Sequence, residues 1–153
     1  MNMENRSSKR ILVVEDDETY REMIKLRLEL AGYEVVAAAD GLSGLNLARK
    51  AHPDLVVLDL SLPEACGATD AEGATLDKRS GHKICRMIKF DQKLKRTPVL
   101  ILTCSDSAED TALAVRSGAD AYLMKTGNPE FFLSEVQKLI NQRRPILSEQ
   151  SAA

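Results

Sequence analysis

Cysteine and histidine are too scarce in this sequence for several common kinds of site. The three cysteines, Cys66, Cys85 and Cys104, are odd in number and widely spaced, and no two form a Cys-x-x-Cys pair. This pattern argues against a disulfide framework or a zinc site and favours a reducing cytoplasm. Because His52 and His82 are the only histidines, a zinc site built on several histidines is excluded, and a histidine-based catalytic triad has two candidate bases.

Long apolar runs and a large excess of one charge are also missing. The longest apolar runs have the length of a strand and the first ten residues are polar, so the sequence predicts neither a membrane span nor a signal peptide. With 21 basic and 23 acidic residues, the net charge is −2. That balance argues against a nucleic-acid surface over the whole domain, though not against a local basic patch. We expect a cytoplasmic protein without membrane contact or direct nucleic-acid contact.

The chain alternates strand-like and helix-like segments. A length of 153 residues corresponds to one domain, which we place at residues 9–142, between flexible ends at 1–8 and 143–153. Predicted strands lie at residues 11–14, 33–37, 55–60, 99–103 and 121–124. Predicted helices lie at 19–30, 42–51 and about 82–90, then from Ser107 to Gly118 and from Asn128-Pro129 onward. Such alternation predicts an α/β fold with a doubly wound parallel sheet.

Local patterns suggest how the helices begin and which sides face inward. Thr19-x-x-Glu22 and Ser107-x-x-Asp110 are predicted capping boxes. Helical spacing groups Met23, Met87 and Phe131 with the apolar residues of their helices. Residues 64–80, which contain two glycines and mixed charges and are followed by a third glycine, Gly81, are predicted to form a long loop.

Polar residues that can carry chemistry follow four of the five predicted strands. Glu15–Asp17 follow the first strand, Asp59 ends the third, Thr103 ends the fourth and Lys125 follows the fifth. In a parallel sheet, ligands bind at the carboxyl ends of the strands. Each residue alone has an ordinary interpretation: acidic residues favour helix N-termini, threonine is common in strands, and loop lysines are usually solvated. Because such residues occur in order at the ends of four predicted strands, together they predict one shared site.

The chemistry of that site follows from its charges. Two carboxylates at 4 Å repel by roughly 4 kcal/mol at an effective dielectric of 20, and a Mg²⁺ ion bound by oxygen ligands relieves the repulsion. An ammonium from Lys125 and a hydroxyl from Thr103 beside the ion would complete a pocket for a phosphoryl group. A carboxylate in this position can act as a nucleophile and form an acyl phosphate.

The sequence resembles the receiver domain of bacterial two-component response regulators. The resemblance covers about Lys9 to Gln142 and rests on four motifs: Ile-Leu-Val-Val-Glu-Asp-Asp-Glu (11–18), Leu-Asp-Leu-Ser-Leu-Pro (58–63), Ile-Leu-Thr-Cys-Ser (101–105) and Tyr-Leu-Met-Lys (122–125). It implies a flavodoxin-like (βα)5 fold with strand order 2-1-3-4-5. It also implies that Asp59 takes a phosphoryl group from a phosphohistidine on a sensor histidine kinase or a histidine phosphotransfer protein, so that the chain is a signalling phosphoacceptor rather than an enzyme.

The same resemblance implies roles for the remaining site residues. Asp16 and Asp59 would hold Mg²⁺ together with the backbone carbonyl of Ser61, while Glu15 would act through water. Asp17 is interpreted as a helix cap first and a metal contact second. Thr103 and Tyr122 would move when Asp59 is phosphorylated and change a surface that a downstream protein target recognises. Whether the phosphorylated form is a homodimer is left open by the sequence.

Three features differ from the family pattern. Thr126 follows Lys125 where proline is usual, which leaves the conformation of that bond open. Cys104 stands where a smaller residue is usual, and we expect it to be a buried, inert thiol. The segment 64–80 is an insertion beside the site, and we slightly favour a role as a lid or partner contact over disorder.

Two other function classes compete with a phosphorylated receiver. An aspartyl-phosphate phosphatase of the haloacid-dehalogenase type needs a second aspartate two residues after the nucleophile, where this sequence has Ser61. A pseudo-receiver would bind partners without phosphorylation, but it usually lacks the aspartate or the acidic pair. Since the chain ends soon after the last predicted helix, we expect a stand-alone receiver with protein–protein output, with a fragment of a larger regulator as the alternative.

Overall fold

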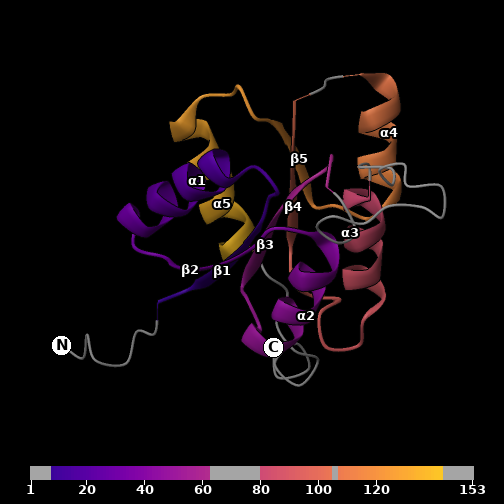
Figure 1. The fold of residues 1–153 in the computed structure, drawn as a ribbon, viewed down its shortest axis with the longest axis horizontal. Helices are drawn as coiled ribbons and strands as arrows, with labels where there is room; N and C mark the ends of the chain where they lie inside the picture. The colour runs from indigo at the N-terminus through magenta and orange to yellow at the C-terminus, as the bar shows by residue number, and fades with distance from the viewer. Residues whose placement is uncertain (1–7, 63–79, 105–106, 143–153) are drawn as a thin grey trace.

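Five parallel strands form one sheet at the centre of the computed structural model, which describes residues 8–62, 80–104 and 107–142. The strands are β1 (Arg10–Val14), β2 (Glu34–Ala38), β3 (Leu55–Asp59), β4 (Val99–Thr103) and β5 (Ala121–Met124). Their order across the sheet is β2-β1-β3-β4-β5 (Figure 1). This confirms the predicted α/β class and the strand order that the resemblance implied.

Helices cover both faces of the sheet (Figure 1). They are α1 (Glu18–Leu30), α2 (Gly41–Ala51), α3 (Gly81–Phe90), α4 (Ala108–Arg116) and α5 (Pro129–Asn141). One buried cluster joins the sheet to α2, α3 and α4, and a second joins it to α1 and α5. Alternate strand residues enter the two clusters, Leu12 and Val14 the first and Ile11 and Val13 the second. Because both faces of the sheet are covered, every residue of β3 and β4 is buried.

The helix starts are set by polar caps, and one differs from the prediction. Asp17, not a Thr19 capping box, caps α1: its Oδ1 accepts a hydrogen bond from the backbone N–H of Tyr20 at 2.9 Å. The helix begins earlier than predicted because the aspartate at position 17 already offers a carboxylate to the free N–H groups. Ser107 caps α4 as predicted, by accepting from Asp110 N–H at 3.1 Å. Asn128 caps α5, with Pro129 at its first position.

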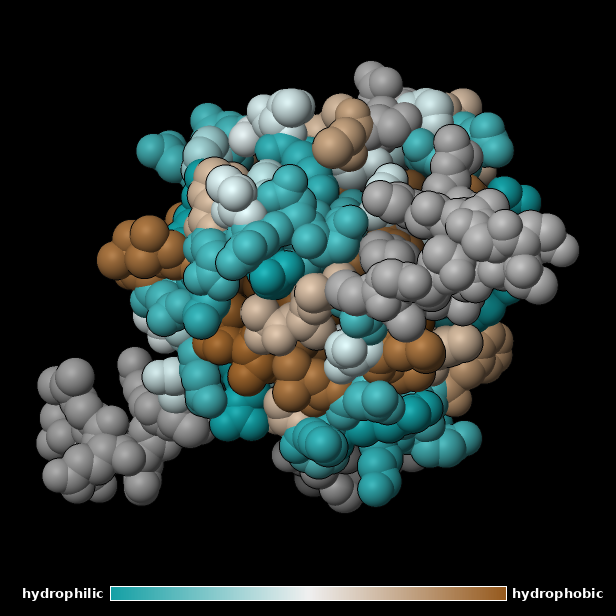
Figure 2. All heavy atoms as spheres, viewed as in Figure 1, coloured by the Kyte–Doolittle hydropathy of each residue, from teal (hydrophilic) through white to brown (hydrophobic). Residues whose placement is uncertain are grey.

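Three residues expected on inward faces are exposed. Met23, Met87 and Phe131 are 41%, 47% and 53% exposed. Each lies at the border of the buried stripe of its helix, and other residues of the helix form that stripe. In α1 the buried residues are Ile24 and Leu28. Apolar side chains therefore stand among hydrophilic ones at the surface (Figure 2), and α1 also exposes Leu26 and Leu30.

The predicted insertion at 64–80 and the predicted flexible ends fall almost wholly outside the described residues. Ser80 is described, and it is anchored to the chain that leaves β3. Its backbone N–H donates to the Leu62 carbonyl at 3.1 Å, and its hydroxyl donates to the same carbonyl. Within the described ranges, no helix is long and apolar enough to cross a membrane.

Gly81, the first residue of α3, packs directly on the backbone at the end of β3. A Cβ atom there would overlap the Asp59 carbonyl oxygen and lie 2.8 Å from Leu60 Cα. We expect Gly81→Ala to lower the free energy of unfolding by about 1–3 kcal/mol, since backbone must move to make room. Urea unfolding measures this loss.

Gly44→Ala in α2 is the matched control. Its Cβ would meet Val14 Cγ2 at 2.8 Å, a side-chain methyl rather than backbone. Alanine also favours a helix interior over glycine by roughly 1 kcal/mol, so the net loss should be smaller. If Gly44→Ala lowers the free energy of unfolding as much as Gly81→Ala does, the close packing of α3 on the backbone of β3 is not the cause of the loss.

Candidate functional site

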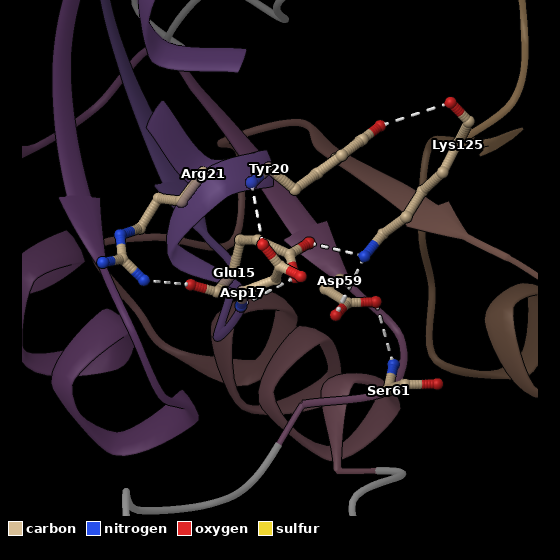
Figure 3. A network of polar contacts seen from close by, with 7 residues as sticks. All are labelled: Glu15, Asp17, Tyr20, Arg21, Asp59, Ser61 and Lys125. Atoms are coloured by element: carbon tan, nitrogen blue, oxygen red, sulfur yellow. Dashed lines mark hydrogen bonds and ion pairs between the residues drawn. The ribbon is translucent and has the colours of Figure 1, made fainter. Parts of the chain in front are cut away.

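The carboxyl ends of the strands bring together residues that are far apart in the sequence. Glu15 directly follows β1, Asp59 ends β3, and Lys125 directly follows β5. Backbone hydrogen bonds fix these exits: Glu15 N–H donates to Ala38 O at 3.0 Å, and Lys125 N–H donates to Thr103 O at 2.7 Å. The predicted convergence at this edge of the sheet is therefore present (Figure 3).

Lys125 lies between two buried carboxylates. Its Nζ is 2.7 Å from Glu15 Oε2 and 3.3 Å from Asp59 Oδ2. The Lys125 side chain is 12% exposed, and those of Glu15 and Asp59 are 4% exposed. Charges so far from water are stable only when paired, so this ammonium compensates both carboxylates.

The proton affinities reflect burial and these charges. Burial raises the pKa of Glu15 to about 7; its hydrogen bond to Lys125 lowers the pKa, and the charge of Asp59 raises it further. Burial by itself lowers the pKa of Lys125, but the hydrogen bond to Glu15 and the two carboxylate charges outweigh this, and the pKa lies above its usual value. Lys125 is therefore a fixed positive charge.

Three carboxylates form a cluster that matches the predicted metal ligands. Glu15, Asp16 and Asp59 each offer a carboxylate oxygen, and these oxygens all lie within 4.8 Å of one another. Glu15 and Asp59 are buried, and Asp16 is half-buried. An all-oxygen, anionic donor set suits Mg²⁺. The residues present thus fit a magnesium ion.

Asp17 and Ser61 occupy distinct places beside this cluster. The Asp17 carboxylate is turned to the start of α1, and its backbone N–H donates to Glu15 Oε1 at 3.2 Å. The interpretation of Asp17 as a cap is therefore confirmed. Ser61 N–H donates to Asp59 Oδ1 at 3.1 Å, which orients the Asp59 carboxylate. That the Ser61 carbonyl binds a metal ion stays a prediction.

Thr103 and Tyr122 lie on the two strands nearest to Lys125. Thr103 is buried at the end of β4, with 2% of its surface exposed. Tyr122, on β5, is half-buried and packs against the cluster of α2, α3 and α4. Their proposed movement on phosphorylation stays a prediction. After Lys125, Gly127 N–H donates to Met124 O at 3.1 Å in a turn, and the described residues contain no cis peptide bond.

Cys104 is exposed, so the prediction of a buried thiol is wrong. The residue follows the last residue of β4, at a point where the chain leaves the sheet. Side chains there are no longer covered by helices on both faces, unlike those within the strand. The buried thiol in the described part of the chain is Cys85, in α3.

Two residues of α1 contact the site and were not predicted. The Tyr20 hydroxyl donates to the Lys125 backbone carbonyl at 3.4 Å, and Lys125 Nζ lies 4.6 Å from the centre of the Tyr20 ring. Arg21 Nη1 donates to the Glu15 backbone carbonyl at 2.9 Å. The one feature of the sequence that could have indicated these contacts is position. Tyr20 and Arg21 lie in the first turn of the helix that follows the acidic end of β1, and that turn must lie close to the strand end.

Comparisons with known proteins agree with this geometry. The family model described as "Response regulator receiver domain" matches residues 11–72. The solved structure of the chemotaxis response regulator CheY4 of Vibrio cholerae is 31% identical with a TM-score of 0.72, and the match covers 87% of this chain and 99% of that one. A putative response regulator from Chloroflexus aurantiacus is 29% identical with a TM-score of 0.75, covering 89% and 100%.

Curated relatives are longer than this chain. The "DNA-binding dual master transcriptional regulator RpaA" of Synechocystis sp. is 35% identical over 133 residues, which are 87% of this chain and 49% of that protein. The chain spans about half the length of the curated relatives it matches.

Removing the shared ammonium should destabilise the protein. We expect Lys125→Met to lower the free energy of unfolding by about 3 kcal/mol, because it leaves Glu15 and Asp59 buried without a counter-charge. Urea unfolding in EDTA at about pH 8, above the pKa of about 7 that Glu15 has in the wild type, measures the loss.

The double variant Lys125→Met/Glu15→Gln tests the cause of that loss. It removes one of the two stranded charges and should recover part of the stability. A Lys125→Met loss within ~0.5 kcal/mol, the range of ordinary surface substitutions, would show that the ion pairs do not support the fold.

Proposed function

This chain belongs to the response regulator receiver family of two-component systems, and we propose that Asp59 is the residue that accepts its phosphoryl group. The supporting observation is the position of Lys125, whose ammonium lies 3.3 Å from Asp59 and 2.7 Å from Glu15 at the ends of three strands. A carboxylate beside a fixed positive charge and an acidic cluster is suited to receiving a phosphoryl group.

In the proposed reaction, a carboxylate oxygen of Asp59 attacks the phosphorus of a phosphohistidine. A P–O bond forms to Asp59, the P–N bond of the donor breaks, and its electron pair remains with the imidazole. Ser61 N–H holds one oxygen of the Asp59 carboxylate, which limits rotation of the nucleophile. The Lys125 ammonium and the Thr103 hydroxyl would stabilise the phosphoryl oxygens.

Glu15, Asp16 and Asp59 would hold the magnesium ion. When bound, Mg²⁺ supplies charge neutralisation for the phosphoryl oxygens. The carboxylates are assigned this task because their oxygens lie within 4.8 Å of one another and match the hard-oxygen preference of the ion. Ser61 would add its backbone carbonyl.

The phosphoryl donor that we propose is a sensor histidine kinase or a histidine phosphotransfer protein, and the output is contact with a downstream protein target through a surface that responds to Thr103 and Tyr122. We place the receiver at residues 9–142.

The predicted absence of nucleic-acid contact lacks support. Two relatives that match this chain over about half of their own length are named DNA-binding regulators. We favour a phosphoacceptor over a phosphatase, since Ser61 offers no carboxylate as general acid.

The acceptor is tested by phosphorylation with a small-molecule donor. Incubation with phosphoramidate and Mg²⁺ should add one phosphoryl group to the wild type, seen by intact-protein mass spectrometry, and none to Asp59→Asn. Asp54→Asn is the matched control, because Asp54 precedes β3 and Asp59 ends it. Equal labelling of Asp59→Asn and wild type would refute the assignment.

The metal site is tested by thermal unfolding. Mg²⁺ at about 100 times its Kd should stabilise the wild type by ~2.7 kcal/mol, seen as a higher Tm in calorimetry. Asp16→Asn should remove most of this rise, while Asp17→Asn should keep it, since asparagine still caps α1. A rise of equal size in Asp16→Asn would place the ion elsewhere.

A further inference from the structure

We propose that Tyr20 is a positioning residue for Lys125: its ring supports the Lys125 ammonium and its hydroxyl holds the Lys125 backbone carbonyl. This inference rests on the proposed function, because the ammonium that Tyr20 positions is the one assigned to the phosphoryl oxygens. Figure 3 shows Tyr20 alongside Lys125, with the ammonium directed toward Glu15 and Asp59.

Two separate contacts join these residues. Lys125 Nζ lies 4.6 Å from the centre of the Tyr20 ring, within the range of a cation–π interaction. The Tyr20 hydroxyl lies 3.4 Å from the Lys125 carbonyl oxygen, which is longer than a strong O–H···O bond of about 2.7–2.8 Å. The ring contact should therefore contribute more than the hydroxyl.

The Tyr20 phenol is neutral, as both contacts require. Tyr20 is half-buried, and burial raises its pKa above the usual value, while the Lys125 charge acts in the opposite direction. A neutral hydroxyl donates a hydrogen bond, and a neutral ring presents its negative face to the ammonium without adding a third carboxylate-like charge.

Lys125 needs support because of where it stands in the chain. It is the first residue after β5, and the next three residues, 126–128, are exposed. Its backbone N–H donates to Thr103 O at 2.7 Å. Its carbonyl oxygen accepts a hydrogen bond from Tyr20, in the first turn of α1.

The ring also limits where the ammonium can go. Lys125 has four rotatable side-chain bonds, and its ammonium is closer to Glu15 than to Asp59, at 2.7 Å against 3.3 Å. A lysine without lateral support loses more rotamer freedom when it must contact an arriving phosphoryl group. The Tyr20 ring removes part of that freedom in advance, which is the usual origin of faster group transfer.

The rate of phosphoryl uptake from phosphoramidate in saturating Mg²⁺ tests the proposal in three variants. Tyr20→Phe keeps the ring and should react within about two-fold of the wild type. Tyr20→Leu removes ring and hydroxyl and should react about three- to thirty-fold more slowly, the range expected for a cation–π contact.

Tyr33→Leu is the matched control for lost packing. Tyr33 and Tyr20 are both partly buried against the same core cluster. Tyr33→Leu should lower the Tm but keep the wild-type uptake rate. The proposal is overturned if Tyr20→Leu reacts as fast as the wild type, if Tyr33→Leu is equally slow, or if Tyr20→Phe is as slow as Tyr20→Leu.

An NMR readout separates this proposal from the proposed function. The Lys125 ε-methylene protons, assigned by their loss in Lys125→Met, should be shifted upfield by the Tyr20 ring in the wild type and in Tyr20→Phe, and not in Tyr20→Leu. If the wild type takes up no phosphoryl group, the proposed function fails, while the shift still measures the contact. An unshifted Lys125 in the wild type would overturn the positioning role even if phosphorylation occurs.

Discussion

Two carboxylates, Glu15 and Asp59, share the ammonium of Lys125 in a part of the molecule that water hardly reaches. Moving such groups out of water is costly, and only mutual pairing offsets the cost. The pKa of Glu15 is raised to about 7, first by burial and then by the charge of Asp59, and the Lys125 ammonium offsets these effects only in part. The site is thus held at a charge imbalance that suits a cation and, after it, a phosphoryl group.

The parallel sheet is what makes this arrangement reachable for one chain. Glu15, Asp59 and Lys125 are separated by dozens of residues, yet each stands where a strand ends. Strands with buried faces and fixed register, such as Asp59 opposite Leu102 and Thr103 opposite Met124, place those ends within hydrogen-bond distance. Gly81 also packs directly on the backbone of Asp59 and Leu60, so that α3 supports the end of β3. The backbone packing at the strand ends therefore determines the geometry of the carboxylates.

The sequence predicted the strands, their approximate ends and the convergence of Glu15, Asp59 and Lys125, because apolar runs and strand-end polarity are local patterns. It did not predict Tyr20 beside Lys125, since that contact joins the first turn of α1 to the residue after β5, which are 105 positions apart, and no local spacing encodes it. Asp17, which the sequence also offered as a helix cap, caps α1 in place of Thr19, because the two nearby candidates compete for the same free N–H groups. Cys104 is exposed because it lies beyond the last residue of β4, and Phe131 because it lies at the border of the buried stripe of α5.

Charge also explains why the proposed function requires a cation as well as Lys125. With Glu15, Asp16 and Asp59 ionised, the cluster and Lys125 together carry an excess of two negative charges. An arriving phosphoryl group, itself anionic, is repelled by that excess at short range. Glu15, Asp16 and Asp59 would hold a divalent cation that offsets this excess, and Lys125, kept charged by its raised pKa, would remain available to the phosphoryl oxygens. A residue that keeps the ammonium in place, as Tyr20 is proposed to do, acts through Lys125.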